Sequence, residues 1–136
     1  MYKALSVIAL TAMAVGITGL FFSNALFAKQ PWVIAIQVAM FALMVWARIT
    51  FGRRTDGVLV TSGPYAYLRH PIYAAIIHFV WAGALDSFSW PVLGWAETVT
   101  AGAFTRMHLE EYVLKRQYPE YRDYKRRAKK FIPFVY

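Results

Sequence analysis

The longest stretch without a charged residue runs from Ala4 to Ala28, and it constrains the chain more than any other feature. At about 1.5 Å of rise per residue, a helix of this length crosses the roughly 30 Å of hydrocarbon in a bilayer. A signal peptide is the alternative, with Lys3 as its basic start and Ser23-Asn24-Ala25 as a cleavage site. The run exceeds the about 7–15 residues of a signal-peptide apolar region, so we predict a transmembrane helix.

A second uncharged run extends from Trp32 to Ala47. Trp32 and Trp46 lie near its two ends, as expected of aromatic residues at the two membrane–water interfaces. Lys29-Gln30-Pro31 separates the two runs, and proline suits the first turn of a helix. The N-terminal part of the chain therefore predicts two membrane spans.

The composition agrees with a membrane protein. Apolar residues make up 59% of the chain and charged residues 16%, against about 45–50% and about 25% in soluble domains. A soluble fold of 136 residues cannot bury so many apolar side chains, so the excess must face lipid. The chain has no cysteine, which excludes disulfides, thiolate metal ligands and cysteine nucleophiles, and we expect no metal site.

Two shorter apolar runs, Pro71 to Leu85 and Trp90 to Phe104, follow a polar, turn-rich stretch. Both are short for a full span, and they are long enough only if the third helix begins near Leu68 and the fourth continues past Arg106. We interpret them as a helical hairpin; the alternative is a hairpin that enters the membrane without crossing it. Glu97 is buried by its sequence position and needs a partner there, because an unpaired carboxylate is costly in a membrane.

Basic residues are concentrated at the C-terminal end, with nine of them between Arg106 and Tyr136. With four crossings, the positive-inside rule places both termini in the cytoplasm of a cell with a bacterial-type inner membrane. A basic end beside an apolar body favours the lipid bilayer as its partner, and no nucleic-acid-binding motif accompanies the charge. We predict a charged helix over Glu120 to Lys130 and an apolar tail, Phe131-Ile132-Pro133-Phe134, that packs back onto the body.

The predicted fold is all-α: a polytopic membrane helical bundle of about four transmembrane helices with a cytoplasmic C-terminal helix. We expect a single domain over residues 1–136. Its parts are two N-terminal spans (1–50), a cytoplasmic loop (51–70), a helical hairpin (71–105) and cytoplasmic C-terminal helices (106–136).

Two groups of polar residues lie at the cytoplasmic membrane edge in this topology. The first comprises Gly63-Pro64-Tyr65 and Arg69-His70-Pro71-Ile72-Tyr73. The second lies on the expected fourth helix and consists of Arg106, His108, Glu110 and Glu111. Spacings of three and four residues place members of the second group on shared helix faces. Taken alone, the residues also fit weak surface ion pairs and an arginine-anchored helix start, but together they can meet in one pocket at the head of the hairpin.

Five short motifs follow one another in the second half of the chain. They are Gly63-Pro64-Tyr65, Arg69-His70-Pro71-x-Tyr73, Glu110-Glu111-x-x-Leu114, Tyr121-x-x-Tyr124 and Ile132-Pro133. In order and spacing they resemble the isoprenylcysteine carboxyl methyltransferase and phospholipid methyltransferase superfamily, integral membrane enzymes that use S-adenosylmethionine. The resemblance covers Leu59 to Pro133, and the first two helices match only as generic spans.

The resemblance implies a pocket for S-adenosyl-L-methionine on the cytoplasmic side. It assigns cofactor binding to Gly63, Tyr65, His70, Pro71, Tyr73, Glu110 and Glu111. It assigns catalytic roles to Arg69, Arg106 and Glu111, with the two arginines binding a carboxylate of the cofactor or the substrate. These residue types suit the cofactor, because glutamates attract its cationic groups, guanidinium groups bind carboxylates, and tyrosine faces stabilise a sulfonium.

The implied activity is methyl transfer to a membrane-embedded or amphipathic acceptor, such as an isoprenylcysteine-type carboxylate, a phospholipid amine or a thiol. An amine would need a base, and His70, His108 or a glutamate would serve. The chain departs from the family at Ala74-Ala75, where glycine is usual, and at Tyr118-Pro119-Glu120-Tyr121, where Gly-x-x-Tyr is usual. These departures affect the inferred identity of the methyl acceptor more than the inferred use of the cofactor.

Two other functions are alternatives to methyl transfer. One is a non-enzymatic membrane protein that acts as a partner subunit or a lipid-binding module through its basic end. The other is a channel or transporter, which is disfavoured because the ionisable groups gather at one face instead of following a path through the membrane. A soluble-type methyltransferase is excluded, because the chain has no Gly-x-Gly-x-x-Gly loop.

Overall fold

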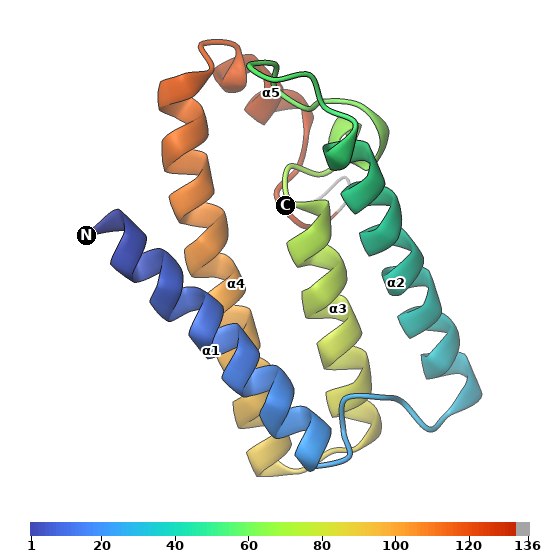
Figure 1. Cartoon of the computed structure of the whole chain (residues 1–136). Helices are drawn as coiled ribbons and strands as arrows, with labels where there is room; N and C mark the ends of the chain where they lie inside the picture. Colours follow the sequence, from blue (N-terminus) through green and yellow to red (C-terminus); the bar gives the residue numbers. More distant parts are fainter. Residues whose placement is uncertain (133–136) are drawn as a thin grey trace.

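The computed structural model describes residues 1–132 and consists of helices joined by short loops (Figure 1). In chain order the helices are α1 (Tyr2–Phe22), α2 (Pro31–Gly52), the 3-10 helix η1 (Gly63–Ala66), α3 (Pro71–Asp86), α4 (Trp90–Gln117) and α5 (Tyr121–Arg127). Within these residues the only β-type pairing is an isolated bridge between Leu68 and Lys129. The predicted all-α class is confirmed.

Two helices of the described chain, α1 and α2, are long and apolar enough to cross a membrane. They have 21 and 22 residues, which gives each a length of roughly 30 Å. Both expose most of their side chains, although these are apolar. The buried stripe of α1 consists of Ala9, Met13, Gly16 and Leu20. Apolar side chains exposed around most of a helix suit lipid and not water, so the chain associates with membranes.

The ends of these two helices differ from the predicted runs. α1 stops at Phe22 instead of continuing to Ala28, because the chain turns at Asn24, which has a φ of +53°. α2 continues to Gly52, beyond the predicted end at Ala47. The loop after α1 carries no charge, and α2 continues past the charged Arg48, so the positions of charged residues do not mark where either helix ends.

The third helix is shorter than a full span. α3 has 16 residues and begins at Pro71 instead of near Leu68. The backbone before it is engaged elsewhere, because the His70 N–H donates to the Lys130 carbonyl. Proline is favourable in the first turn because it has no N–H that would need a partner.

The fourth helix has 28 residues and continues past Arg106 to Gln117, in agreement with the prediction. Pro119 disfavours helical backbone at Tyr118, and the helix ends there. One expectation for this helix was wrong: Glu97 is exposed and not buried. The neighbouring side chains face α1 and α3, which leaves Glu97 on the outer face of α4.

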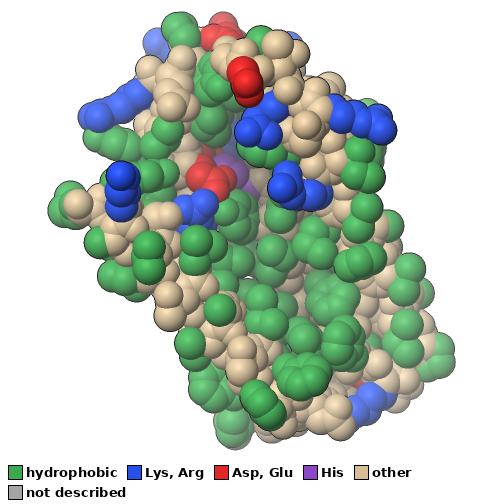
Figure 2. All heavy atoms as spheres, in the orientation of Figure 1, with side chains coloured by type: hydrophobic (Ala, Val, Ile, Leu, Met, Phe, Trp, Pro, Cys, Tyr) green, Lys and Arg blue, Asp and Glu red, His purple; other side chains and the backbone are tan. Residues whose placement is uncertain are grey.

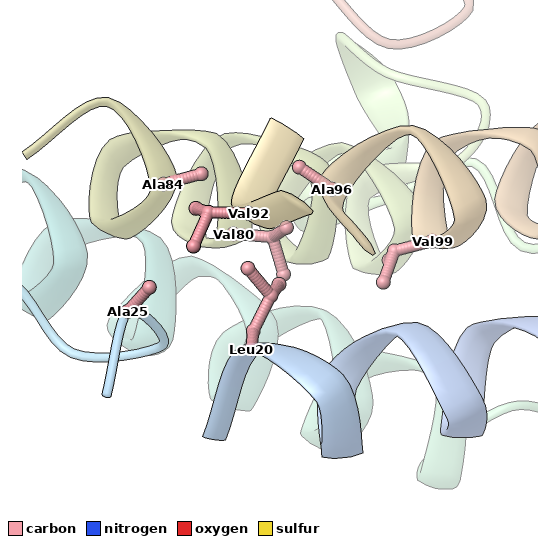
Figure 3. Close-up of a cluster of buried hydrophobic side chains, with 7 residues drawn as sticks. All are labelled: Leu20, Ala25, Val80, Ala84, Val92, Ala96 and Val99. Atoms are coloured by element: carbon pink, nitrogen blue, oxygen red, sulfur yellow. The ribbon is translucent and has the colours of Figure 1, made fainter. Parts of the chain in front are cut away.

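The helices pack as two pairs joined by the α3–α4 hairpin: α1 lies along α4, and α2 lies along α3 (Figure 1). Glycines let α1 approach α4 closely, since a Cβ added to Gly16 would lie 2.6 Å from the Val99 side chain. A buried apolar cluster, which we call the apolar end, joins α1, α3, α4 and the loop after α1 (Figure 3). Its members are Leu20, Ala25, Val80, Ala84, Val92, Ala96 and Val99.

The C-terminal segment covers the other end of the bundle. α5 has 7 residues and is shorter than the predicted helix over Glu120 to Lys130. Its Tyr121 and Tyr124 side chains are buried and pack with Leu59 from the loop after α2. The charged residues of α5 therefore form its outer surface, and the two tyrosines attach it to the body.

The chain after α5 runs beside the segment that precedes α3. The Arg69 N–H donates to the Lys129 carbonyl at 2.7 Å. The rings of Phe131 and Phe104 lie 5.2 Å apart between centroids, so this part of the tail packs back onto the body. The remainder of the predicted tail, Pro133-Phe134, lies outside the described residues.

Candidate functional site

A cavity of about 460 Å³ opens at the α5 end of the bundle. Its wall combines the end of α2, the loop after it, η1, the start of α3 and the last two turns of α4. Figure 2 shows the hollow, with carboxylate and imidazole groups at its base, basic side chains around it and a mainly apolar surface below it. The two polar sequence motifs therefore meet at this cavity.

His70 lies at the N-terminal end of α3 and is buried. Its ring sits between two consecutive glutamates of α4. Nδ1 is 3.7 Å from Oε2 of Glu110, and Nε2 is 3.3 Å from Oε1 of Glu111. Because consecutive helix residues point about 100° apart, the ring fills the angle between the two carboxylates. His70 thus connects both glutamates to the start of α3.

Glu111 is buried and is not part of the cavity lining. Its Oε1 accepts from Nε of Arg69 at 3.0 Å, and Lys125 Nζ is 3.6 Å from Oε2. Burial alone would raise the pKa of Glu111, but the hydrogen bond from His70 and the charges of Arg69 and Lys125 outweigh it and hold the pKa well below its usual range. Glu111 is therefore a charged internal anchor.

The guanidinium of Arg69 extends this anchor to the C-terminal segment. One of its terminal nitrogens donates to the Lys125 carbonyl at 3.1 Å and to the Ala128 carbonyl at 2.8 Å. Cations are favourable at the C-terminal end of a helix, where carbonyl groups lack intrahelical partners. Arg69 and Glu111 thereby fasten α5 to α3 and α4.

Glu110 faces the cavity and is the more accessible glutamate, with 32% of its side chain exposed against 7% for Glu111. Its Oε1 accepts from the Tyr73 hydroxyl at 2.6 Å and from Arg106 at 2.9 Å. Burial opposes ionisation, yet hydrogen bonds from His70 and Tyr73 and the charge of Arg106 lower the pKa of Glu110. The cavity therefore has a carboxylate at its base.

Arg106 connects this carboxylate to α1. Its Nε donates to the Tyr73 hydroxyl at 3.2 Å, and another of its nitrogens contacts the Ser6 hydroxyl. Its side chain lies behind Tyr73 and Glu110, outside the lining of the cavity. Arg106 thus orients two groups that do line the cavity.

The η1 turn supplies Tyr65 to the cavity wall. The Tyr65 carbonyl accepts from the Tyr124 hydroxyl at 2.7 Å, which ties the turn to α5. Burial, followed by the charge of Glu110, raises the pKa of Tyr65 to about 12, so the phenol stays neutral. Gly63 begins the turn with a φ of +56°, a conformation that favours glycine, and a Cβ there would lie 3.0 Å from Thr50 Oγ1.

The predicted site residues fall into three groups. Those that line the cavity are Tyr65, Arg69, His70, Pro71, Tyr73 and Glu110. Arg106 and Glu111 lie directly behind the wall and hold lining residues in place. Gly63 lines a neighbouring surface hollow beside the α2 end and shapes the turn that carries Tyr65. Their individual roles in catalysis and cofactor binding stay predictions.

Several lining residues were not predicted from the sequence, among them Tyr2, Phe51 and Arg54. Arg54 lies 4.2 Å above the Phe51 ring, measured from its Cζ to the ring centroid. The arginines of the central loop were a usable signal for Arg54, since they share a membrane side with both polar motifs. Nothing in the sequence indicated that the first residues of α1 reach this cavity.

The two other histidines lie outside the cavity lining. His108 Nε2 is 3.2 Å from Lys130 Nζ, and its Nδ1 is 2.8 Å from the Phe104 carbonyl. His78 Nδ1 is 2.7 Å from the Ala74 carbonyl. Both rings therefore interact with their own helix and are not part of the cavity lining.

Comparison with known proteins places these features in a family. The sequence profile described as phospholipid methyltransferase matches residues 48–121. That range contains the η1 turn, the start of α3 and the Glu110–Glu111 pair. No solved structure matches the chain.

Two curated relatives are metal resistance proteins by name. The chain is 32% identical over 94 residues to the nickel-cobalt-cadmium resistance protein NccN of Alcaligenes xylosoxydans xylosoxydans. It is 31% identical over 96 residues to the cobalt-zinc-cadmium resistance protein CzcN of Cupriavidus metallidurans. Each match covers 65% of this chain and 42% of the relative, so the chain spans less than half the length of these relatives. Because the family profile matches more than half of its residues, the chain belongs to the phospholipid methyltransferase family.

Proposed function

We propose that the chain is an S-adenosylmethionine-dependent methyltransferase that acts on a membrane-embedded or amphipathic acceptor. The observation that carries this proposal is the cavity beside Glu110, which combines one accessible carboxylate with aromatic and apolar walls. Its volume, about 460 Å³, falls in the range of small-molecule sites, roughly 300–1,000 Å³. Family membership supports the same activity.

The residues around the cavity fit the cofactor's chemical groups. The Glu110 carboxylate suits an ammonium or a sulfonium, and the arginines at positions 54 and 69 suit a carboxylate. The neutral phenol ring of Tyr65 offers a face to a cation, and Leu59 and Leu114 offer apolar surface to a flat base. When bound, S-adenosylmethionine supplies an electrophilic methyl group on its sulfonium.

The chain's own part in the reaction is to position the reactants and to exclude water. The anchor of Arg69 and Glu111 keeps α5 over the cavity, and Arg106 fixes the Tyr73 hydroxyl against Glu110. A carboxylate or thiolate acceptor needs no base. An amine or thiol acceptor needs one, and the Glu110 carboxylate is the accessible proton acceptor in the cavity.

We infer that all four long helices cross the membrane, with both termini in the cytoplasm. α3 is six residues shorter than α2, which corresponds to about 9 Å. The cavity at the start of α3 would therefore lie below the membrane surface, flanked by the longer α2 and α4. Ile72 and Tyr2 line it on the side that faces α1, where an acyl or prenyl chain would approach.

The names of the two relatives favour a second candidate, a non-enzymatic subunit of a metal resistance system. Direct metal binding by this chain has little support from its residues. Among residues 1–132, no group of three or more His, Cys, Asp or Glu side chains is arranged to hold a metal ion. A contribution to metal resistance would then come through a methylated product or a protein partner.

Calorimetric titration of S-adenosylhomocysteine into the detergent-purified chain tests the proposal. We expect micromolar binding by the native chain and at least tenfold weaker binding by Glu110→Gln. Glu120→Gln is the matched control, because Glu120 is exposed and lies outside the cavity lining. No binding by a monodisperse, helical native sample would contradict the proposal and favour the subunit.

A further inference from the structure

A second hollow, of about 480 Å³, lies next to the cavity at the end of α2. It is lined by the last turn of α2, the loop after this helix and the start of η1, where the chain returns to α2 (Figure 1). The two hollows share part of one wall, which consists of Arg54, Val58, Leu59 and Val60. The proposed methyl transfer takes place in the cavity, so the second hollow, which we call the α2 hollow, has no role in it.

Two arginines give the α2 hollow a positive charge that the chain does not neutralise. Arg53 is exposed, and within residues 1–132 its side chain has no hydrogen bond or ion pair. Arg54 contacts only its own turn there: it donates to the Phe51 carbonyl at 3.1 Å, and its Cζ lies 4.2 Å from the Phe51 ring centroid. Among the described residues no carboxylate lines this hollow, and the nearby Asp56 pairs with neither arginine. The α2 hollow therefore attracts anions.

The hydrogen-bond donors in the α2 hollow suit a phosphate. A guanidinium has five N–H groups, and the Phe51 carbonyl uses only one nitrogen of Arg54. The hydroxyls of Thr55, Thr61 and Ser62 also line the hollow, and none has a hydrogen bond within the described chain. Together these donors exceed the roughly four hydrogen bonds that a carboxylate accepts. A phosphate has four oxygen atoms instead of two, and arginine binds it in a bidentate manner.

The position of α2 puts this hollow at the level of lipid headgroups. α2 is apolar and long enough to cross a membrane, and the hollow begins at its last turn. The headgroup region on each side of the hydrocarbon is roughly 5–8 Å thick. Trp46 is exposed one turn below Thr50, as expected of a tryptophan at the membrane–water interface. The arginines just above it therefore lie at the depth of lipid phosphates.

One face of α2 leads from the hydrocarbon to the hollow. Trp46, Ile49, Thr50 and Arg53 lie along this face, at spacings of three, four and seven residues. Trp46 and Ile49 are 51% and 48% exposed, and Thr50 and Arg53 line the hollow. A Cβ added to Gly63, another lining residue, would lie 3.6 Å from Trp46 Nε1, so the tryptophan borders the hollow. Apolar side chains below two arginines match a lipid, whereas a free phosphate would use only the arginines.

We propose that the α2 hollow binds the phosphate group of a membrane lipid, whose acyl chains lie along the exposed face of α2. The donors to the phosphate are Arg53, Arg54, Thr55, Thr61 and Ser62. The bound phosphate contacts the wall that this hollow shares with the cavity. The site is separate from methyl transfer and binds its lipid whether or not the cavity holds a cofactor.

Native mass spectrometry of the full chain in detergent tests this proposal, with dioleoyl phosphatidylglycerol as the probe. Dioleoyl glycerol has the same acyl chains and no phosphate, and we expect it to bind at least tenfold more weakly. Arg53→Gln should bind the phospholipid about tenfold more weakly than the native chain. Arg122→Gln is the matched control, because it removes an exposed charge from α5, and it should stay within twofold of the native chain. Unchanged binding by Arg53→Gln, equal weakening in both variants, or equal binding of the two lipids would overturn the proposal.

Protection of an introduced thiol locates the bound phosphate, because the native chain has no cysteine. Thr50 lines the α2 hollow and not the cavity, and its hydroxyl donates to the Trp46 carbonyl. We expect phosphatidylglycerol to slow maleimide labelling of Thr50→Cys at least fivefold and to leave Ala66→Cys unchanged. Ala66 is the control, because it is exposed and lines neither hollow. Equal protection at positions 50 and 66 would contradict the site, and equal protection of Thr50→Cys by the same concentration of inorganic phosphate would contradict a lipid as its ligand.

Discussion

The two ends of the bundle are held together by different interactions. At the apolar end, small and branched apolar side chains of α1, α3 and α4 pack closely (Figure 3). At the charged end, which we define by Arg69, His70, Glu110 and Glu111, ion pairs and hydrogen bonds join α3, α4 and α5. Close packing of apolar side chains therefore holds one end together, and electrostatic interactions hold the other end together.

This difference predicts which substitutions weaken folding alone and which also weaken ligand binding. The apolar end lacks groups that a polar ligand would recognise, while every ionised group at the charged end also positions the cavity wall. Substitutions at the apolar end should therefore weaken folding with little effect on binding, and substitutions at the charged end should weaken both folding and binding.

Removal of the Arg69 side chain should have the largest effect. Arg69→Met leaves Glu111 buried without its closest cation, and breaking a buried pair costs about 3–5 kcal/mol. We expect release of α5, rapid trypsin cleavage within residues 122–130, and at least 100-fold weaker binding of S-adenosylhomocysteine. Arg126→Met is the control, because Arg126 and its partner Asp123 are exposed. Native-like protease resistance in Arg69→Met would show that Arg69 does not hold α5 in place.

Gly16→Ala should destabilise the apolar end. The new Cβ would lie 2.6 Å from the Val99 side chain, so α1 and α4 must separate. Overpacking of this kind costs about 1–3 kcal/mol, and the melting temperature in detergent should fall by several degrees, with less than a tenfold change in binding. Gly52→Ala is the matched control, because a Cβ there meets nothing within 4 Å. Equal melting temperatures for the two variants would argue against close α1–α4 packing.

Acid should weaken the charged end selectively. The folded-state pKa of Glu111 lies below its ordinary value of 4.5, so its ionisation stabilises the fold above pH 4.5, and this contribution is lost as the pH falls below that value. We expect the melting temperature of the native chain to fall between about pH 5 and pH 3, and Glu111→Gln to show a flatter profile with lower stability at pH 6. The same pH slope in both proteins would show that Glu111 is not the responsible group.

The smallest effect is expected at a polar contact between α3 and α4 near the apolar end. The Trp81 indole N–H donates to the Thr100 hydroxyl at 2.9 Å. Thr100→Val removes the acceptor, and interhelical hydrogen bonds of this kind contribute about 0.6 kcal/mol in membranes. A small decrease in melting temperature relative to the exposed control Thr18→Val checks this expectation; a large decrease would mean that packing was also lost.

Sequence patterns predicted the spans and the polar motifs because both depend on local composition. The uncharged runs became α1 and α2, and the spacing of Glu110 and Glu111 placed both on α4. The division of roles between these glutamates was not predictable, because it depends on which side of α4 faces α3. The cavity-lining position of Arg54 is likewise a long-range result of folding.

The wrong prediction of burial for Glu97 has the same cause. An ionisable residue inside an apolar run suggests burial within the bundle, but the run alone does not say which helix face is covered. The packing of α1 and α3 on α4 decides that, and it leaves Glu97 outside. The helix face that carries Glu97 was therefore not predictable from hydropathy alone.

Photoaffinity labelling with an azido derivative of S-adenosylmethionine, followed by peptide mapping, tests the central claim most directly. We expect label within residues 51–73 or 110–124, at the charged end, displaced by S-adenosylhomocysteine and strongly reduced in Glu110→Gln. Label that S-adenosylhomocysteine does not displace, or that maps to the apolar end around Leu20 and Val80, would contradict the assignment of this cavity as the cofactor site.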